Sequence, residues 1–217
     1  TAYEMLRSLV GSEMCIRDSQ YTIAQRGLLY INTLTTLTER LNANVGSLVI
    51  AESGLAKQTL SVLQNARSYG QSAIAAVTKK IPKFDIHMAN EKDYEEYLHL
   101  VPDVYRDHWY ATIFNHLLTQ KARKMLTSGP LDRHQLGALM NAHQKILQQR
   151  IQNTPEIMQK QMQAACEAGA LGTKIIGSGG GGCMVAMVTD NTKEKVIHAF
   201  LNKGAKASYE ISLTTPL

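Results

Sequence analysis

The sequence predicts an α+β fold, in which helices and antiparallel strands share one core. Short apolar runs rich in β-branched residues occur between longer segments whose apolar residues recur every three or four positions. A run of glycines, Gly177 and Gly179–Gly182, lies between two of the short apolar runs, which favours a pair of antiparallel strands. This order differs from the regular strand–helix alternation of a doubly wound parallel sheet.

The elements before residue 130 can be placed in order. Residues 27–33 and 46–52 are short, apolar and rich in β-formers, so both are expected to be strands. A helix is expected next, because the following apolar residues share one helical face: Leu60, Leu63, Ala66, Ile74 and Val77. Residues 79–90 are expected to form a loop. Residues 103–125 are expected to be helical, as one helix or two joined ones.

Two helices after residue 130 have clear start signals. Asp132 is expected to cap the first, with Gln135 completing a capping box. The core-facing stripe of this helix is Leu136, Leu139, Met140, His143, Ile146 and Leu147. Thr154 is expected to be the N-cap of the second helix, with Pro155 at its first position and Gly169 at its end.

The remaining elements lie around the glycine run. Strands are expected at residues 173–176 and 183–188, on either side of the glycines. A helix over 191–202 and a last strand over 207–213 complete the chain. Strands and helices are therefore mixed along the second half of the sequence.

The composition excludes several classes of protein. With 44% hydrophobic and 19% charged residues, the 217-residue chain can bury a core. The net charge of +5 comes from scattered Lys and Arg, so no nucleic-acid partner is expected. The three cysteines and seven histidines lack metal or disulfide spacing, which favours a reducing, cytoplasmic setting without a bound metal site. No apolar run reaches the roughly eighteen residues of a membrane span, so no membrane partner is expected.

The glycine run does not fit the familiar phosphate-binding loops. A Walker loop carries Lys and a hydroxyl after its last glycine, whereas Cys183 and Met184 follow here. A dinucleotide-binding loop opens a helix, whereas a strand is expected after Gly182. A protein-kinase glycine loop is followed by a Val and then a strand with a Lys, which is missing. From the residues alone, a role next to a ligand and a purely structural turn both stay open.

Three segments resemble the GHMP small-molecule kinases, a family that includes galactokinase, homoserine kinase, mevalonate kinase and phosphomevalonate kinase. Residues 167–187, EAGALGTKIIGSGGGGCMVAM, resemble the third conserved motif of that family. Residues 136–143, LGALMNAH, resemble the helix before this motif, and residues 48–54, LVIAESG, resemble the strand after the family's catalytic aspartate. The resemblance covers Gln20 to the C-terminus and is nearest to galactokinase-like members.

The resemblance implies a fold and an activity. It implies a ferredoxin-like C-terminal domain, an antiparallel sheet with helices on one side, over residues 57–217, and a remnant of the N-terminal domain over 20–56. It implies ATP-dependent transfer of the γ-phosphoryl group to a sugar hydroxyl, expected to be the anomeric one, with ATP and Mg²⁺ as cofactors. A mevalonate- or isoprenoid-type kinase is the alternative acceptor class. A non-catalytic α+β binding module is the alternative of another class.

The resemblance also implies which residues lie near the ligands. Those expected near the nucleotide phosphates are Lys174, Gly177, Ser178, Gly179, Gly180, Gly181 and Gly182. Those expected near the acceptor are Ser53, Gly54, Tyr69 and His143. For His143 the alternative is a packed core histidine, and for Tyr69 a surface residue of a helix. For Lys174 an outward side chain is equally open.

The N-terminal segment differs from the rest. Residues 8–19, SLVGSEMCIRDS, match the translation of a common sequencing-library adapter, so residues 1–19 are expected to be foreign to the natural gene. An uninterrupted genomic read that encodes this peptide would contradict the interpretation.

The catalytic aspartate of the family is expected directly before Gln20. Asp18 stands one position too early, so no catalytic residue is assigned. The family's first two motifs, including the loop that wraps the triphosphate, do not occur in this sequence. A truncated C-terminal fragment without kinase activity of its own is therefore expected.

Overall fold

The computed structural model describes residues 27–32, 35, 37–56 and 59–211, with only the backbone for residues 59–65. The segment expected to be foreign, residues 1–19, lies outside the described residues, as does the end of the predicted last strand at 212–213. None of the helices that the structure describes has the length and apolarity needed to cross a lipid bilayer.

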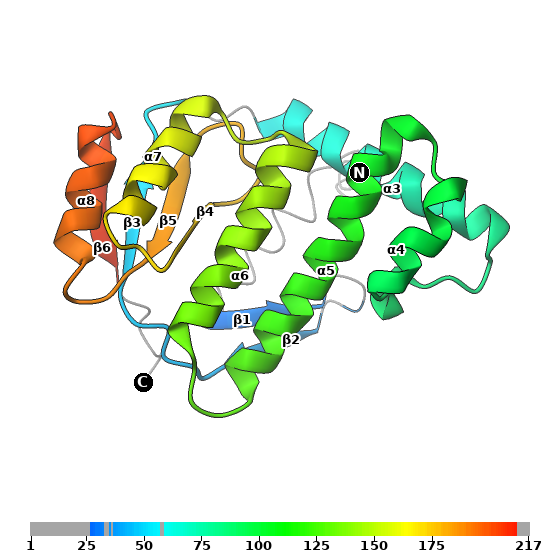
Figure 1. Ribbon diagram of the computed structural model, residues 1–217, viewed down its shortest axis with the longest axis horizontal. Helices are drawn as coiled ribbons and strands as arrows, with labels where there is room; N and C mark the ends of the chain where they lie inside the picture. The colour runs from blue at the N-terminus through cyan, green and yellow to red at the C-terminus, as the bar shows by residue number, and fades with distance from the viewer. Residues whose placement is uncertain (1–26, 33–34, 36, 57–58, 212–217) are drawn as a thin grey trace, which may run out of the picture.

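A four-stranded antiparallel sheet forms one end of the molecule (Figure 1). Its strands are β3 (Leu48–Glu52), β4 (Gly172–Ile175), β5 (Cys183–Met187) and β6 (Ala207–Ile211). The spatial order is β4-β5-β3-β6, so that β3 pairs with both β5 and β6. With helices between β3 and β4 and between β5 and β6, the element order is that of a split β-α-β, ferredoxin-like unit. The predicted α+β class and antiparallel strand pair around the glycines are confirmed.

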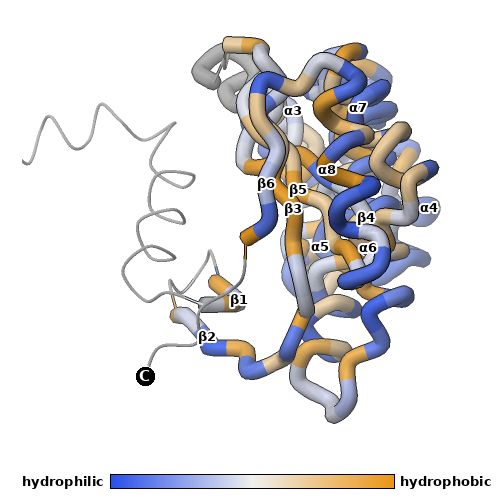
Figure 2. The backbone as a smooth tube through the Cα atoms, turned by 90° about the vertical axis from the view of Figure 1, so that its left-hand side faces the viewer, coloured by the Kyte–Doolittle hydropathy of each residue, from blue (hydrophilic) through white to orange (hydrophobic). Residues whose placement is uncertain are grey.

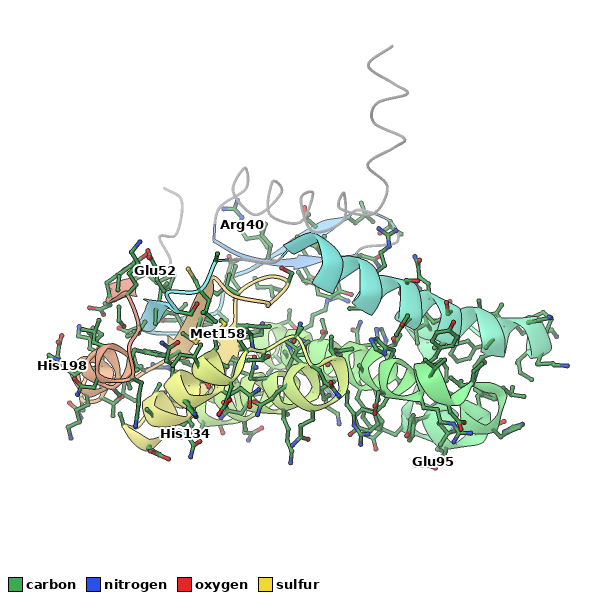
Figure 3. All side chains as sticks on the ribbon, turned by 90° about the horizontal axis from the view of Figure 1, so that it is seen from above. Arg40, Glu52, Glu95, His134, Met158 and His198 are labelled. Atoms are coloured by element: carbon green, nitrogen blue, oxygen red, sulfur yellow. The ribbon has the colours of Figure 1, made fainter. Side chains whose placement is uncertain are left out.

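Helices cover one face of this sheet (Figure 2). They are α6 (Arg133–Ile146), which continues into a π-helical turn (Leu147–Ile151), α7 (Glu156–Glu167) and α8 (Lys193–Asn202). Alternate residues of β3 and β5 point toward α7 and α8, as the period of a strand requires. The fully buried side chains between these layers include Val49, Ala51, Met158, Met184, Ala186 and Phe200. Met158 points from α7 toward the sheet (Figure 3).

A second helical cluster lies beside the sheet domain (Figure 1). It consists of α3 (Thr59–Lys80), α4 (Glu91–Tyr97) and α5 (Arg106–Thr127), joined by 3₁₀ turns at 86–88, 98–100 and 103–105. Trp109 is fully buried at its centre and donates from Nε1 to the Tyr94 carbonyl at 3.3 Å. The sequence predicted α3 and α5 but missed α4, which Asn90 and Asp93 start with a capping box. Residues 106–127 form one continuous helix, not two joined ones.

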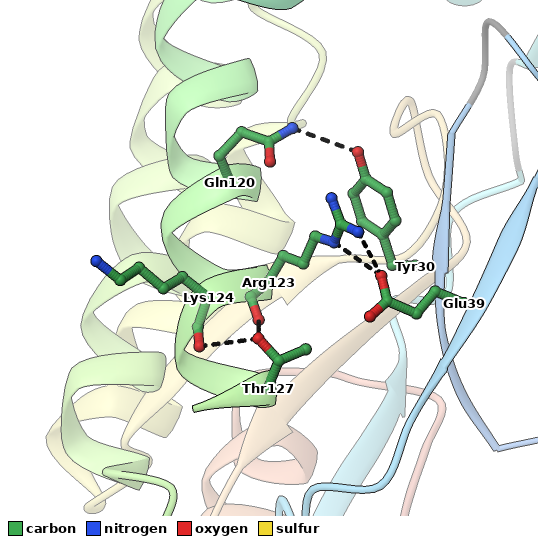
Figure 4. A network of polar contacts seen from close by, with 6 residues as sticks. All are labelled: Tyr30, Glu39, Gln120, Arg123, Lys124 and Thr127. Atoms are coloured by element: carbon green, nitrogen blue, oxygen red, sulfur yellow. Dashed lines mark hydrogen bonds and ion pairs between the residues drawn. The ribbon is translucent and has the colours of Figure 1, made fainter. Parts of the chain in front are cut away.

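A two-stranded antiparallel ribbon packs against α5. Its strands are β1 (Leu28–Ile31) and β2 (Thr38–Leu41), of which only the first was predicted. Figure 4 shows Arg123 of α5 paired with Glu39 at 2.6 Å. The same guanidinium lies 4.2 Å from the centre of the Tyr30 ring, a cation–π contact.

The domain boundary expected at residues 56 and 57 stays a prediction. β3 lies before that boundary and supplies a central strand of the same sheet as β4, β5 and β6. The sheet is therefore built from both sides of the expected boundary.

The N-cap predicted at Thr154 is wrong. Pro155 occupies the N-cap of α7 without a side-chain cap. Thr154 is buried, and its hydroxyl instead accepts a hydrogen bond from Gln144 of α6 at 3.0 Å. The cap predicted at Asp132 is confirmed, because its carboxylate accepts from the backbone N–H groups of His134 and Gln135.

Candidate functional site

The glycine run forms the loop between β4 and β5, and its backbone conformation requires glycine. All five glycines, Gly177 and Gly179–Gly182, have positive φ, from 71° at Gly180 to 129° at Gly181. Residues with a Cβ rarely adopt these angles, because Cβ then approaches the following carbonyl oxygen. The backbone conformation of the loop therefore explains why these five positions are glycine.

Two other segments approach the loop so closely that a side chain could not fit. A Cβ at Gly179 would lie 2.3 Å from the carbonyl oxygen of Asn153, which lies three positions before the first residue of α7. A Cβ at Gly181 would lie 2.5 Å from the carbonyl oxygen of Ala56, just after β3. The loop is thus pressed between the start of α7 and the end of β3.

Four hydrogen bonds fix the loop to these neighbours. On the α7 side, Gly180 N–H donates to the Asn153 carbonyl at 2.7 Å, and Asn153 Nδ2 donates to the Ser178 carbonyl at 2.9 Å. On the β3 side, Gly182 N–H donates to the Leu55 carbonyl at 3.1 Å, and Ser53 N–H donates to the Gly182 carbonyl at 2.9 Å. A loop held on both sides presents its backbone in one defined arrangement.

Some backbone donors of the loop stay available to a ligand. Within the described part of the chain, no acceptor faces the N–H groups of Gly181 and of three successive residues, Gly177, Ser178 and Gly179. Glycine-rich turns with successive free N–H groups form concave sites that attract anions. The Ser178 hydroxyl differs, since it is buried and directed to the Gly179 carbonyl at 3.4 Å. The loop can therefore bind an anion through its backbone.

Ser53 and Gly54 lie next to the glycine loop. Ser53 is buried at the end of β3, where its Oγ accepts a hydrogen bond from Leu55 N–H at 3.2 Å. Gly54 has a φ of 83° and turns the chain at this point. The structure thus brings these two predicted residues to the loop, with the Ser53 hydroxyl engaged in the turn.

Lys174 and His143 lie near each other on β4 and α6. The Lys174 ammonium donates to the Ile175 carbonyl at 2.8 Å, and burial lowers the pKa of Lys174. Burial, and then the charge of Lys174, lowers the pKa of His143 to about 4. His143 is therefore a neutral histidine at pH 7. Such a side chain is compatible both with a packed role and with one near a ligand.

Tyr69 is not brought to the loop. Its ring makes edge-to-face contacts with Tyr105, at 5.4 Å between ring centres, and with His108 at 5.0 Å. Both partners belong to the α3–α5 cluster. The alternative of a helix residue away from the loop fits these contacts.

The residues that sequence reasoning missed are polar side chains of α6 and of the α6–α7 connection. Asn141 and Gln144 accept hydrogen bonds from the N–H groups of Thr173 and Ile175, at 2.8 and 2.9 Å, along the outer edge of β4. Their spacing of three residues places both on one face of α6. That spacing was a usable signal. Nothing local in the sequence distinguishes Asn153 from an ordinary cap residue.

Among the described residues, no group of three or more His, Cys, Asp or Glu side chains could hold a metal ion. The loop itself contains no carboxylate.

Part of the chain matches a known family model. The family model described as GHMP kinases C terminal matches residues 126–206. These residues are therefore similar to the C-terminal domain of GHMP kinases. The matched range contains α6, α7, β4, β5, α8 and the glycine loop.

One relative matches part of the chain in sequence. The mevalonate kinase of Thermococcus gammatolerans is 34% identical over 98 residues, which are 44% of this chain and 29% of that protein. The chain thus spans less than a third of this relative.

Solved structures share the fold. Lactococcus lactis galactokinase, complexed with galactose, superposes with a TM-score of 0.72 at 16% identity, over 86% of this chain and 50% of that one. L. major mevalonate kinase, in complex with R-mevalonate, gives 0.51 at 19% identity, over 83% and 47%. At these identities the likeness establishes the fold, and this chain spans about half of each structure.

Proposed function

We propose that this chain is the C-terminal part of an ATP-dependent small-molecule kinase, and that the glycine loop forms one wall of its triphosphate site. The observation that carries the proposal is the loop itself. It is held on two sides and has backbone N–H groups at Gly177, Gly179 and Gly181 that face no described acceptor. The match of residues 126–206 to the GHMP kinase C-terminal family model supports a phosphate ligand over a purely structural turn.

In this proposal the loop acts by position and charge. Phosphoryl transfer depends mainly on positioning and on stabilising negative charge on the phosphate oxygens. The free N–H groups would hold such oxygens, and ATP supplies the phosphoryl group that is transferred. Mg²⁺ would arrive with the triphosphate, because the described residues offer no ligand cluster for it. No described residue is assigned the activation of the acceptor hydroxyl.

The acceptor we propose is a sugar, phosphorylated at its anomeric hydroxyl. The sequence resemblance to galactokinase-like members and the fold shared with galactokinase support this choice. A mevalonate-type acceptor is the second candidate, favoured by the 34% identity to a mevalonate kinase. A cytoplasmic protein is part of the same proposal, based on three cysteines without a pairing pattern.

A kinase assay separates the two acceptors. The assay uses the longer gene product that includes the natural sequence before Gln20, with ATP–Mg²⁺ and either galactose or mevalonate. Turnover with a sugar supports the first candidate, and turnover with mevalonate alone replaces it with the second. No turnover with any sugar or mevalonate-type alcohol would contradict a kinase.

The chain of 217 residues is expected to show no kinase activity by itself. In this respect it would behave as the non-catalytic binding module considered above. Calorimetric titration with ATP–Mg²⁺ tests this expectation. A dissociation constant below about 0.1 mM, inside the usual range of substrate affinity, would contradict it.

A further inference from the structure

A buried hydrogen-bonded relay joins the two ends of the β4–loop segment through α6 and the start of α7. Ile175 N–H donates to Gln144 Oε1 at 2.9 Å, and Gln144 Nε2 donates to the Thr154 hydroxyl at 3.0 Å. The Thr154 hydroxyl donates to Asn153 Oδ1 at 3.4 Å. Asn153 Nδ2 then donates to the Ser178 carbonyl at 2.9 Å. Every donor in this relay points the same way, from the strand to the loop.

The relay leaves Asn153 one orientation. Its amide oxygen is the acceptor for Thr154, so its amide nitrogen must face the loop. Its own carbonyl meanwhile accepts from Gly180 N–H at 2.7 Å. Asn153 therefore holds the loop on both sides of Gly179, where no side chain would fit beneath the loop.

The backbone before Asn153 has two uncommon features, a π-helical turn and a left-handed residue. The π-helical turn at 147–151 ends at Gln152, whose φ of 56° is left-handed. Gln152 is the only described residue other than glycine with a positive φ. Asn153 N–H returns to the Leu147 carbonyl at 3.3 Å. π-Helical turns and left-handed residues other than glycine occur often at functional sites.

We infer that Asn153 is a positioning residue for the glycine loop, and that Thr154 and Gln144 fix its orientation. Asn153 forms hydrogen bonds with the Ser178 carbonyl and with the Gly180 N–H. These two groups therefore point into the protein, while the N–H groups of Gly177, Gly179 and Gly181 face no described acceptor. The ligand would be the triphosphate of the proposed function, and the inference rests on that function for its ligand but not for its geometry.

The test compares five forms of the 217-residue chain: wild type, Asn153→Asp, Thr154→Val, Thr154→Ser and Gln148→Ala. Asn153→Asp removes the donor to Ser178 and retains the acceptor for Thr154. Thr154→Val removes the hydroxyl without a change of charge, and Thr154→Ser restores it. Gln148→Ala is the matched control, because it removes a hydrogen bond of 2.7 Å to Gln159 between α7 and the same π-helical turn. Gln159 contacts the relay only through the backbone carbonyl of Thr154, so the side-chain hydrogen bonds of the relay stay in place.

Two quantities are measured on each form. The first is the hydrogen-exchange rate of the Gly180 and Gly182 amides, and the second is the affinity for inorganic tripolyphosphate. We expect Asn153→Asp to raise Gly180 exchange by about tenfold, the effect of one buried hydrogen bond. It should weaken tripolyphosphate binding by at least as much, because the new carboxylate also repels the anion. Thr154→Val should change both in the same direction by less. Thr154→Ser and Gln148→Ala should stay near wild type.

The outcomes separate the inference from the proposed function. If the wild type binds tripolyphosphate and neither Asn153→Asp nor Thr154→Val differs from Gln148→Ala, the positioning role is refuted. If the wild type does not bind, the proposed ligand is contradicted for this chain, and exchange alone decides the role of Asn153. Faster exchange at Gly180 in Asn153→Asp and Thr154→Val, but not in Thr154→Ser, would then support it. Unchanged exchange would overturn it.

Discussion

At the scale of single residues, two glycines with left-handed backbone have different surroundings: Gly179 lies in the glycine loop, and Gly204 follows α8. Gly179 and Gly204 have nearly the same φ, 80° and 83°. A Cβ at Gly179 would lie 2.3 Å from the Asn153 carbonyl oxygen, whereas a Cβ at Gly204 would contact nothing within 4 Å. A comparison of substitutions at the two positions therefore separates the effect of backbone conformation from that of close packing.

We predict that Gly179→Ala destabilises the protein more than Gly204→Ala. The left-handed conformation costs alanine about 1 kcal/mol at either position. Overpacking against Asn153 adds about 1–3 kcal/mol at Gly179 only. Urea unfolding of both variants measures the difference. Equal losses would mean that the loop does not lie against Asn153.

His143 gives the protein a pH-dependent component of stability. Its folded pKa of about 4 lies below the ordinary value of 6.5. Between these values the unfolded chain binds a proton that the folded chain does not, so stability falls as the pH falls from 6.5 to 4. At pH 7 His143 is neutral in both states, so it causes no loss of stability.

We predict that His143→Gln makes unfolding less sensitive to acid. The wild type should lose up to about 3 kcal/mol from this one group between pH 7 and pH 4. The variant should lack that part of the loss. His198→Gln is the control, since His198 lies exposed on the outer side of α8 (Figure 3). If His143→Gln follows the wild-type pH profile as closely as His198→Gln does, the pKa of His143 is not lowered in the folded protein.

At the scale of elements, the edge of β4 shows which features of the fold could be predicted from sequence patterns and which could not. The glycine run and its flanking apolar residues were enough to predict the β4–β5 pair. An exposed strand edge offers unpaired N–H groups, and here side-chain amides of α6 take them up. This contact depends on where α6 packs, which no local pattern contains.

We predict that Gln144→Leu destabilises the fold by about 1–3 kcal/mol. It leaves the buried Ile175 N–H without an acceptor, and a buried unpaired donor carries that cost. Gln163→Leu should be nearly neutral, because Gln163 is exposed on α7 and its amide donates to Glu167 of the same helix. Thermal unfolding compares the two. A neutral Gln144→Leu would show that water or another group replaces the amide.

Other elements were missed or misassigned for similar reasons. β2 carries the short sequence TERL, which has no apolar run, and its contacts with β1 and α5 form only in the folded protein. Thr154 precedes a proline and a glutamate, a strong cap pattern, yet its hydroxyl is used by Gln144. A tertiary hydrogen bond has here overridden a local preference.

At the scale of the whole molecule, the sheet domain and the helical cluster have separate cores. One centres on Met158, Met184 and Phe200, and the other on Trp109 and Ile113. The glycine loop lies where β3, β4, β5 and α7 meet. Ser53 and the glycines could be assigned to this loop region from sequence motifs. Asn153 and Gln144, which hydrogen-bond to the loop and to β4, could be identified only from the folded structure.

The central claim is that the glycine loop binds phosphate. Its most direct test is an NMR titration of the 217-residue chain with ATP–Mg²⁺ and, separately, with adenosine, followed at the backbone amides. We predict that ATP–Mg²⁺ shifts the amides of Gly177, Gly179 and Gly181 most, at millimolar concentrations, and that adenosine leaves them unchanged. Loop amides that do not shift at about 10 mM ATP–Mg²⁺ would contradict the claim. The dissociation constant would then lie above about 10 mM, which is weaker than the usual range for a substrate.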